Sequence, residues 1–177
     1  MVAVFAAMVG QAPNTWTIYP YLNDFWTNQV TCETRFQALP IPDVLVSAPR
    51  LSWTIADFIE LARLPAEASR YDAVVTCFFL DTATNALDYI DAMERVLVKG
   101  GHWVNVGPLH WHTNARIVLT AQDLHALFST LKSWKIIEWS LDTEPLEYRS
   151  VTTNTEGDTT STRYEAYRPL RFVVEKK

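Results

Sequence analysis

The chain has 177 residues, 49% of them hydrophobic and 20% charged, which is the composition of an ordinary globular domain. Its formal net charge of −5 argues against a protein that binds nucleic acid by neutralising phosphates, because such proteins usually present a basic face. The apolar start over residues 1–9 has no basic residue before it and is far shorter than the roughly 20 residues that span a bilayer, so we expect neither a secretory signal nor a membrane partner.

The first third of the chain predicts little regular structure. Residues 1–10 indicate a buried helical piece, and residues 11–50 contain five prolines, which favours a looped connection. Short extended segments are expected over Trp16–Pro20 and Leu51–Ile55, followed by a helical turn through residues 56–62.

The middle of the chain has the pattern of a βαβ unit. Residues Tyr71–Leu80 are almost all apolar, which is typical of a strand buried on both faces of a parallel sheet. Residues Thr84–Val98 show helical apolar spacing and stop at Lys99-Gly100-Gly101. A second buried strand is predicted over His102–Val106, so the unit is strand, helix and parallel strand.

Four further segments complete the predicted order. A helix begins at Thr120, and a strand covers Trp134–Trp139. The polar stretch 150–163 predicts a surface loop, and Tyr167–Val174 a closing strand. We expect one domain over residues 1–177.

Two long motifs stand out in the βαβ segment: the Cys-Phe-Phe-Leu-Asp-Thr-Ala run of residues 77–83 with Asp88-Tyr89-Ile90, and the run from Gly100 to Leu109 with Trp111-His112. They resemble the signature motifs of the carnosine N-methyltransferase family, and the similarity runs over essentially the whole chain. The resemblance implies an α/β fold, a Rossmann-like class I methyltransferase sheet with helices on both faces.

The same resemblance implies an activity. The family uses S-adenosyl-L-methionine to methylate an imidazole nitrogen of carnosine or related histidyl dipeptides, giving anserine-type products. The expected partner is therefore the small dipeptide substrate. Neither nucleic acid nor a membrane is expected as a partner, and a homo-oligomer is an alternative to a monomer. With Cys32 and Cys77 forming neither a disulfide framework nor a metal spacing, a cytoplasmic location is expected, and the family adds the nucleus.

Six residues acquire roles from the resemblance. On the cofactor side it implies Asp57 and Phe58 at the adenosine end and Cys77 at a strand end; on the substrate side it implies Asp81, His112 and Tyr167.

The chemistry of these residues is consistent with those roles. Asp57, Asp81 and His112 each lie just past the end of a predicted strand, where open α/β sheets bind ligands. A carboxylate at Asp81 can accept the N–H of the substrate imidazole or pair with the peptide ammonium, and His112 and Tyr167 can bind the substrate carboxylate or amide.

Simpler interpretations stay open beside these. Asp57 and Asp81 also suit N-caps of the helices that follow them, and Cys77 suits a small buried hydrophobe. His110 and His112 would share a face if extended, but no third ligand with metal spacing accompanies them, so no metal is expected.

The glycine-rich turn of class I methyltransferases has no counterpart in this sequence. The chain has five glycines and none are spaced G-x-G. By comparison with the family the chain begins after the first two strands, which leaves Tyr71–Leu80 with an unpaired apolar edge. We therefore expect this polypeptide alone to bind the cofactor poorly, and the alternative function is a non-catalytic methyltransferase-like fragment that serves at most as an interaction module.

Overall fold

The computed structural model describes residues 8–23, 29–45, 52–148 and 161–177. The chain divides into two compact units, unit 1 from Met1–Ile55 and Glu147–Glu165, and unit 2 from Ala56–Leu146 and Ala166–Lys177. Within the described ranges, no helix is long and apolar enough to cross a membrane. The predicted helical piece at residues 1–10 and the loop at 150–163 fall mostly outside the described residues.

The described residues of unit 1 include a pair of short strands and a short helix. Strand β1 (Trp16–Ile18) pairs antiparallel with β2 (Leu39–Ile41), which confirms the extended segment predicted at Trp16–Pro20. Helix α2 (Cys32–Arg35) begins after Thr31, whose hydroxyl accepts the Thr34 N–H at 3.1 Å and so caps the helix.

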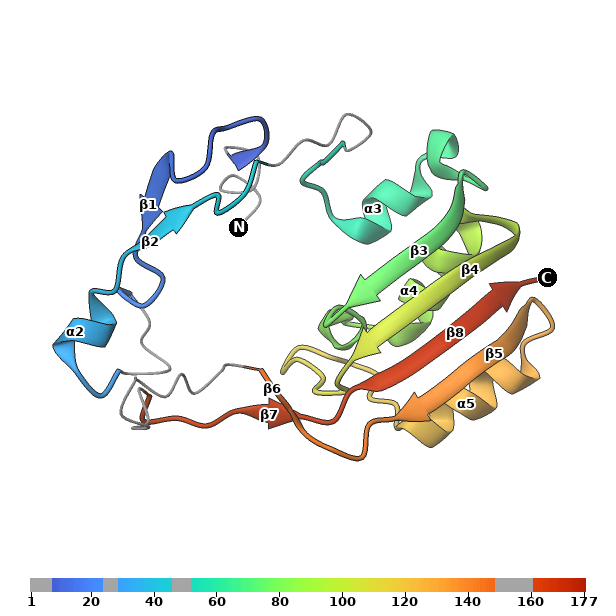
Figure 1. The fold of residues 1–177 in the computed structure, drawn as a ribbon. Coiled ribbons are helices and arrows are strands. Elements are labelled where there is room, and N and C mark those ends of the chain that lie inside the picture. The colour runs from blue at the N-terminus through green and yellow to red at the C-terminus, as the bar shows by residue number, and fades with distance from the viewer. Residues whose placement is uncertain (1–7, 24–28, 46–51, 149–160) are drawn as a thin grey trace. The chain divides into compact units, whose positions relative to one another are not determined.

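Unit 2 is built on a four-stranded sheet in the order β3-β4-β8-β5 (Figure 1). The strands are β3 (Tyr71–Cys77), β4 (Leu97–Gly107), β5 (Trp134–Leu141) and β8 (Leu170–Lys176). β3 and β4 run parallel, whereas β8 is antiparallel to both β4 and β5. The expected α/β fold with a parallel βαβ unit is confirmed, on a mixed sheet.

Helix α4 (Ala86–Val96) makes the connection between the two parallel strands. It is shorter than the predicted Thr84–Val98, because the Asn85 side chain caps it by accepting the Leu87 N–H and because strand β4 starts at once after Val96. The expected glycine stop lies inside β4: Gly100 has φ +78°, and a Cβ on Gly101 would come within 2.9 Å of the Val98 carbonyl oxygen. These glycines allow the register of β4 on β3 to shift here.

The remaining elements of unit 2 are short. Helix α3 (Phe58–Arg63) is followed by the 3₁₀ turn η1 (Pro65–Glu67), and η2 (Leu80–Thr82) follows β3. Helix α5 (Ala121–Thr130) begins after Thr120, which confirms the predicted start, with a capping box in which Thr120 and Asp123 bond reciprocally. The short strands β6 (Leu146–Glu147) and β7 (Ala166–Tyr167) pair with each other.

Two predicted strands differ from the structure. Residues 52–57 form no strand, so the extended segment at Leu51–Ile55 is wrong for its described part; among the described residues no neighbour pairs with it. The closing strand is divided into β7 and β8 by Arg168-Pro169, because a proline cannot donate to the ladder.

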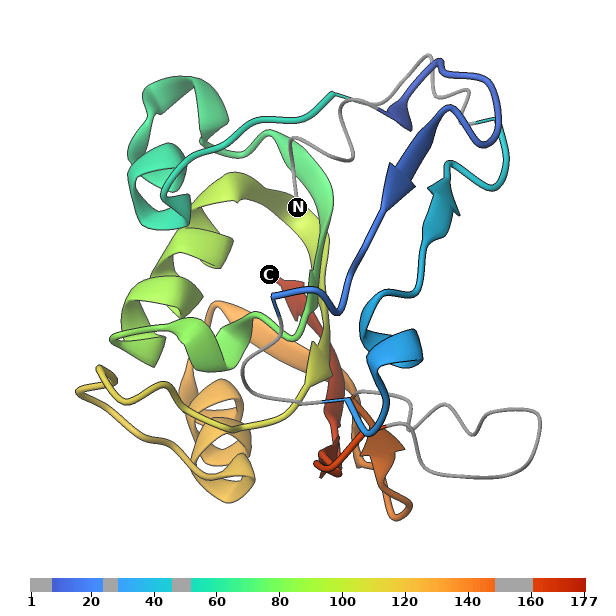
Figure 2. The same cartoon turned by 90° about the vertical axis from the view of Figure 1, so that its left-hand side faces the viewer.

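The core of unit 2 lies between one face of the sheet and its helices. Helices α3, α4 and α5 lie on the same side of the sheet (Figure 2), so the expected helices on both faces are wrong for the described helices of unit 2. The cluster under α4 and α5 consists of buried apolar side chains from these two helices, from η2 and from β4, β5 and β8: Leu80, Ile90, Met93, Leu97, Trp103, Leu124, Phe128, Trp134, Leu170, Phe172 and Val174.

The opposite face of β3 is open. Val75 is 70% exposed, so the prediction of a strand over Tyr71–Leu80 buried on both faces is wrong. The physical reason is that the helices pack on the other face, where Val74 lies against Ala62 of α3 and Val96 of α4, and Thr76 is buried. The strand also ends earlier than predicted, at Cys77, because Phe78 has a left-handed backbone with φ +50°.

Candidate functional site

The carboxyl ends of β3 and β4 are joined by a close backbone contact. The Phe78 N–H donates to the Val106 carbonyl at 2.8 Å. A Cβ on Gly107 would come within 3.0 Å of both the N and the Cα of Phe78, so only glycine fits here without a shift of the backbone. This contact holds Phe78 in its left-handed conformation, which is a rare state for a bulky residue, and turns the chain from β3 into η2.

Asp81 lies in η2 and is the central acidic group of the site. The residue is only 6% exposed. Burial raises the pKa of its carboxyl above the ordinary value, and backbone hydrogen bonds from Asp81 itself and from His110, with the nearby His112 and His110 rings, partly oppose that increase. The His112 N–H donates to the Asp81 carbonyl at 3.1 Å, which ties the loop after β4 to η2.

Tyr167, in β7, contacts two aromatic side chains from this end of the sheet. Its ring centroid lies 6.1 Å from that of Phe78 in an edge-on arrangement, and 5.6 Å from the His110 ring. The structure therefore brings three segments together at the ends of β3, β4 and β7. The predicted substrate residues Asp81, His112 and Tyr167 all belong to these segments.

The predicted cofactor residues of α3 lie at the same end of the sheet. Asp57 is exposed and caps α3, because its Oδ1 accepts the Glu60 N–H at 3.1 Å. Phe58 packs edge-on against Phe79, with ring centroids 5.6 Å apart, and Phe79 follows β3 by two residues. This contact places the N-terminus of α3 beside the end of β3, although the Phe58 ring is half-buried among other aromatic rings.

The alternative interpretations of these residues have different outcomes. Asp57 is a helix cap, as that interpretation predicts, whereas Asp81 is not, because Asn85 caps α4. Cys77, at the end of β3 in register with Val106, is an exposed free thiol and not a buried hydrophobe.

A buried hydrogen-bond network fixes the strands that carry the site. The Asn105 amide of β4 accepts from the Thr76 hydroxyl of β3 at 2.8 Å and donates to the Leu170 carbonyl of β8 at 3.2 Å. The Trp103 indole N–H donates to the same hydroxyl at 2.9 Å. Because the three strands are linked near their ends, the segments carrying Asp81, His110 and Tyr167 are held on a rigid base.

Sequence reasoning missed the contribution of two residues. Phe78 shapes the turn and contacts Tyr167, and the His110 backbone N–H stabilises the Asp81 carboxylate. The available signal was the His110-x-His112 spacing, which indicates two histidines on one face of an extended segment after β4. In the described part of the chain, no group of three or more His, Cys, Asp or Glu side chains is arranged to hold a metal ion.

The residues present fit part of an S-adenosyl-L-methionine site. Asp57 uses one carboxylate oxygen for its cap, and a carboxylate can still accept from a ribose hydroxyl or an exocyclic amine through the other. Cys77, the third expected cofactor residue, is an exposed free cysteine at the end of β3. None of the five glycines are spaced G-x-G, so the sequence has no glycine-rich turn of the kind that approaches the methionine portion.

Comparisons with known proteins identify the family of this chain. The sequence model of the family described as carnosine N-methyltransferase matches residues 1–177. The carnosine N-methyltransferase of Schizosaccharomyces pombe is 32% identical over 169 residues, which is 90% of this chain and 45% of that protein. The carnosine N-methyltransferase of Mus musculus is 30% identical over 172 residues, 92% of this chain and 40% of that protein.

The chain thus spans less than half the length of these two curated relatives. A solved structure, TehB from Haemophilus influenzae, aligns with 70% of this chain and 40% of its own at 16% identity, with a TM-score of 0.46. The family match and the two relatives cover nearly every residue described above, and the chain belongs to the carnosine N-methyltransferase family.

Proposed function

We propose that unit 2 holds the methyl acceptor of an S-adenosyl-L-methionine-dependent N-methyltransferase acting on the imidazole ring of carnosine or a related histidyl dipeptide, with an anserine-type product. The observation that carries the proposal is the Asp81 carboxyl, which is buried at the carboxyl end of β3 beside His110 and His112. The family match and the names of the two curated relatives support the substrate class.

Asp81 is the residue proposed to orient the imidazole. The bound cofactor supplies an electrophilic methyl group on a sulfonium, so the accepting nitrogen must present a free lone pair. A carboxylate that accepts the N–H of one imidazole nitrogen fixes the tautomer and leaves the other nitrogen unprotonated. Because burial raises the pKa of Asp81, its carboxylate is incompletely solvated, and a hydrogen bond from the substrate stabilises it more than it would in water.

Tyr167 and His112 are proposed to hold the remainder of the dipeptide. The Tyr167 ring is positioned by Phe78 and His110, so its hydroxyl has a defined location from which to bind the substrate carboxylate or amide. The His112 side chain is exposed, while its backbone is fixed on Asp81. The site then acts by proximity and orientation, which is the main requirement of this reaction.

The test uses a chimera, because the chain spans less than half the length of its relatives. The matched region of the S. pombe relative is replaced by this chain, and transfer of labelled methyl to carnosine is measured. We expect Asp81→Asn to lower kcat/KM about a hundredfold or more, since misplaced reactants lose that much. The matched controls Asp88→Asn, on an exposed part of α4, and His102→Ala, on exposed β4, should leave the rate unchanged. Equal rates for Asp81→Asn and Asp88→Asn would contradict the proposal.

N-acetylated carnosine distinguishes the two roles open to Asp81. If Asp81 accepts the imidazole N–H, the acetylated dipeptide, which lacks the ammonium, remains a substrate. If Asp81 pairs with the ammonium, acetylation should reduce turnover to the level of Asp81→Asn, because the charge partner is lost in both cases.

The non-catalytic alternative is favoured by one observation, the absence of a G-x-G spacing among the five glycines. Calorimetric titration of S-adenosyl-L-methionine into the isolated chain distinguishes the catalytic from the non-catalytic function of this chain. Weak or absent binding is expected for this chain alone, and tight stoichiometric binding would overturn that expectation. Methyl transfer by the chimera, together with no binding by the isolated chain, would assign the activity to the longer polypeptide.

A further inference from the structure

The Asp81 carboxyl is carried by a short turn whose beginning has no side-chain cap. η2 is three residues long, and no side chain bonds to its first N–H groups. The turn closes through its own backbone, because the Thr82 N–H donates to the Phe79 carbonyl at 3.1 Å and the Ala83 N–H to the Leu80 carbonyl at 3.2 Å. The hydrogen bonds of a 3₁₀ turn have poorer geometry than those of an α-helix, so the orientation of η2 depends on contacts from neighbouring elements.

The two parts of the first sequence motif, residues 77–83 and 88–90, meet at a hydrogen bond between Thr82 and Tyr89. The two hydroxyl oxygens are 3.2 Å apart, and the Thr82 hydroxyl donates to the Phe79 carbonyl at 2.7 Å. A hydroxyl has one proton, so Thr82 cannot donate to both, and the Tyr89 hydroxyl is the donor in their hydrogen bond. The Tyr89 hydroxyl of α4 therefore holds η2 at its last residue.

The Tyr89 ring connects η2 to the beginning of α3. It stacks on the Phe79 ring, with centroids 5.1 Å apart and an interplanar angle of 22°. The Phe58 ring lies edge-on to both of these rings, at 5.6 Å from each. Phe58 directly follows Asp57, which caps α3. One aromatic cluster therefore contacts both the segment of the expected cofactor residues and the turn that carries Asp81.

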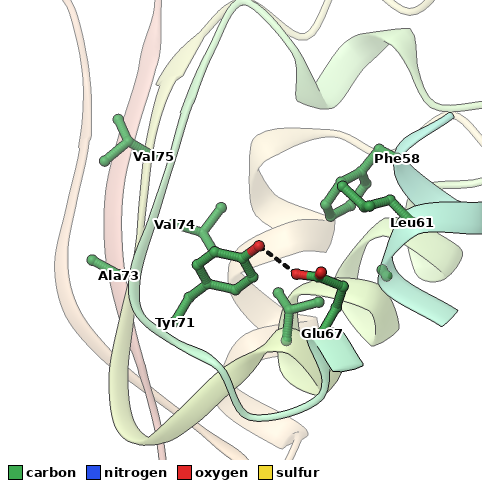
Figure 3. Close-up of a pocket in the computed structure, with 9 residues that line it drawn as sticks. Phe58, Leu61, Glu67, Tyr71, Ala73, Val74 and Val75 are labelled. Atoms are coloured by element: carbon green, nitrogen blue, oxygen red, sulfur yellow. Dashed lines mark hydrogen bonds between the residues drawn. The ribbon is translucent and has the colours of Figure 1, made fainter. Parts of the chain in front are cut away.

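The Phe58 ring has space beside it. Together with Leu61, Val74 and Val75, its side chain lines an apolar pocket of about 270 Å³ (Figure 3). A side chain has no packing contacts on the side that faces such a space. A variant that removes the Tyr89 ring should therefore let the Phe58 ring move toward the pocket.

We propose that Tyr89 is a positioning residue for the methyl-transfer site: its hydroxyl holds η2 so that the Asp81 carboxylate is aligned with the substrate imidazole, and its ring holds the beginning of α3 through Phe58. This inference rests on the proposed function of Asp81. In this role Tyr89 acts through Thr82 and Phe58 and not on the substrate itself. A displacement of about 1 Å at the reacting groups can cost about a hundredfold in rate, so contacts of this kind affect turnover.

The first test measures kcat and KM in the chimera with variants that separate the Tyr89 hydroxyl from its ring. Tyr89→Phe keeps the stacked ring and should lower kcat for carnosine about tenfold, with the KM of S-adenosyl-L-methionine unchanged. Tyr89→Leu also removes the ring and should in addition raise that KM about fivefold. Ser133→Ala is the matched control, because it removes a hydroxyl that donates to Glu94 in the last turn of α4 at 2.9 Å, away from η2. Its kcat should be unchanged.

Thr82→Val tests the same hydrogen bond from its other side. It should lower kcat at least as much as Tyr89→Phe, because it removes both the acceptor of the Tyr89 hydroxyl and the donor to the Phe79 carbonyl. The double variant should be no slower than Thr82→Val alone, since the Tyr89 hydroxyl then has no partner to lose. Losses that multiply in the double variant would show that the two hydroxyls act independently, and would overturn the proposal.

A second measurement requires no methyl transfer. The pKa of the Asp81 carboxyl is measured by NMR in this chain and in its variants. Burial holds this pKa above the ordinary value of 3.8. If Tyr89 holds η2, Tyr89→Leu should hydrate the carboxyl and lower its pKa toward 3.8, whereas Ser133→Ala should leave it unchanged. If Tyr89→Leu does not fold, Tyr89→Phe provides the same comparison with a smaller expected decrease.

The outcomes separate this inference from the proposed function. An unchanged Asp81 pKa in the folded Tyr89 variant, or equal kcat values for Tyr89→Phe and Ser133→Ala, would overturn the positioning role and leave the role of Asp81 intact. Equal rates for Asp81→Asn and Asp88→Asn would instead contradict the proposed function.

Discussion

Replacing Asn105 with alanine tests whether one buried amide holds the strands of the site together. The side chain is 2% exposed and makes two buried hydrogen bonds, at 2.8 Å with the Thr76 hydroxyl and at 3.2 Å with the Leu170 carbonyl. Leaving a buried partner unsatisfied costs about 1–3 kcal/mol, so the loss of both bonds should lower the free energy of unfolding by about 2–5 kcal/mol. The Thr76 hydroxyl still accepts from the Trp103 indole N–H after the substitution, so only the two hydrogen bonds of Asn105 are lost.

The assay is urea denaturation followed by tryptophan fluorescence, with the midpoint compared at an unchanged m-value. Thr76→Val is the partner variant, and the double variant completes a double-mutant cycle. Because Thr76 and Asn105 bond directly, the cycle should give a coupling energy of about 0.5–3 kcal/mol. A loss below about 0.5 kcal/mol for Asn105→Ala, which is typical of a surface substitution, would refute the reasoning.

Three other predictions follow from single contacts. Gly107→Ala should destabilise the chain by about 1–3 kcal/mol and move Phe78, because the new Cβ would come within 3.0 Å of its backbone; an unchanged melting temperature would contradict this. Burial raises the pKa of Asp81 above the ordinary value of 3.8, so its ionised carboxylate lowers the free energy of unfolding at neutral pH. Asp81→Asn should therefore raise the urea denaturation midpoint at pH 7 but not at pH 3, where the carboxyl is protonated in both states. Equal shifts at the two pH values would be inconsistent with a buried ionised carboxyl. The hydrogen bond to Glu67 and burial raise the pKa of Tyr71 above 10.0, so Glu67→Gln should lower the Tyr71 pKa in an ultraviolet titration, and no change would show that the bond is not formed in solution.

Local signals in the sequence were sufficient for the βαβ unit and for the start of α5. The apolar run at residues 71–80, the helical spacing after it and the glycines before His102 predicted a βαβ unit, and β3, α4 and β4 confirm it. The start of α5 at Thr120 was also predicted, and the structure shows the local reason, a capping box made by two residues three apart. Such features depend on contacts between near neighbours and can be read in chain order.

The assembly of the site depended on contacts that no local pattern encodes. The sequence placed Asp81 and His112 after two predicted strands, but only the tertiary structure shows that the loop after β4 returns to η2 and that Tyr167 lies between Phe78 and His110. The left-handed backbone of Phe78 is another example, since a bulky aromatic residue disfavours it and the close approach of Gly107 imposes it.

The burial of β3 was likewise decided by tertiary structure. A continuous apolar run reads the same whether both faces are covered or only one, because the sequence reports the chemistry of a side chain and not its neighbours. The described helices of unit 2 cover the Val74 face, and Val75 stays exposed on the other. Composition and periodicity therefore determined which residues form the strand, whereas the packing of helices far away in the chain determined which of its faces and edges remain available.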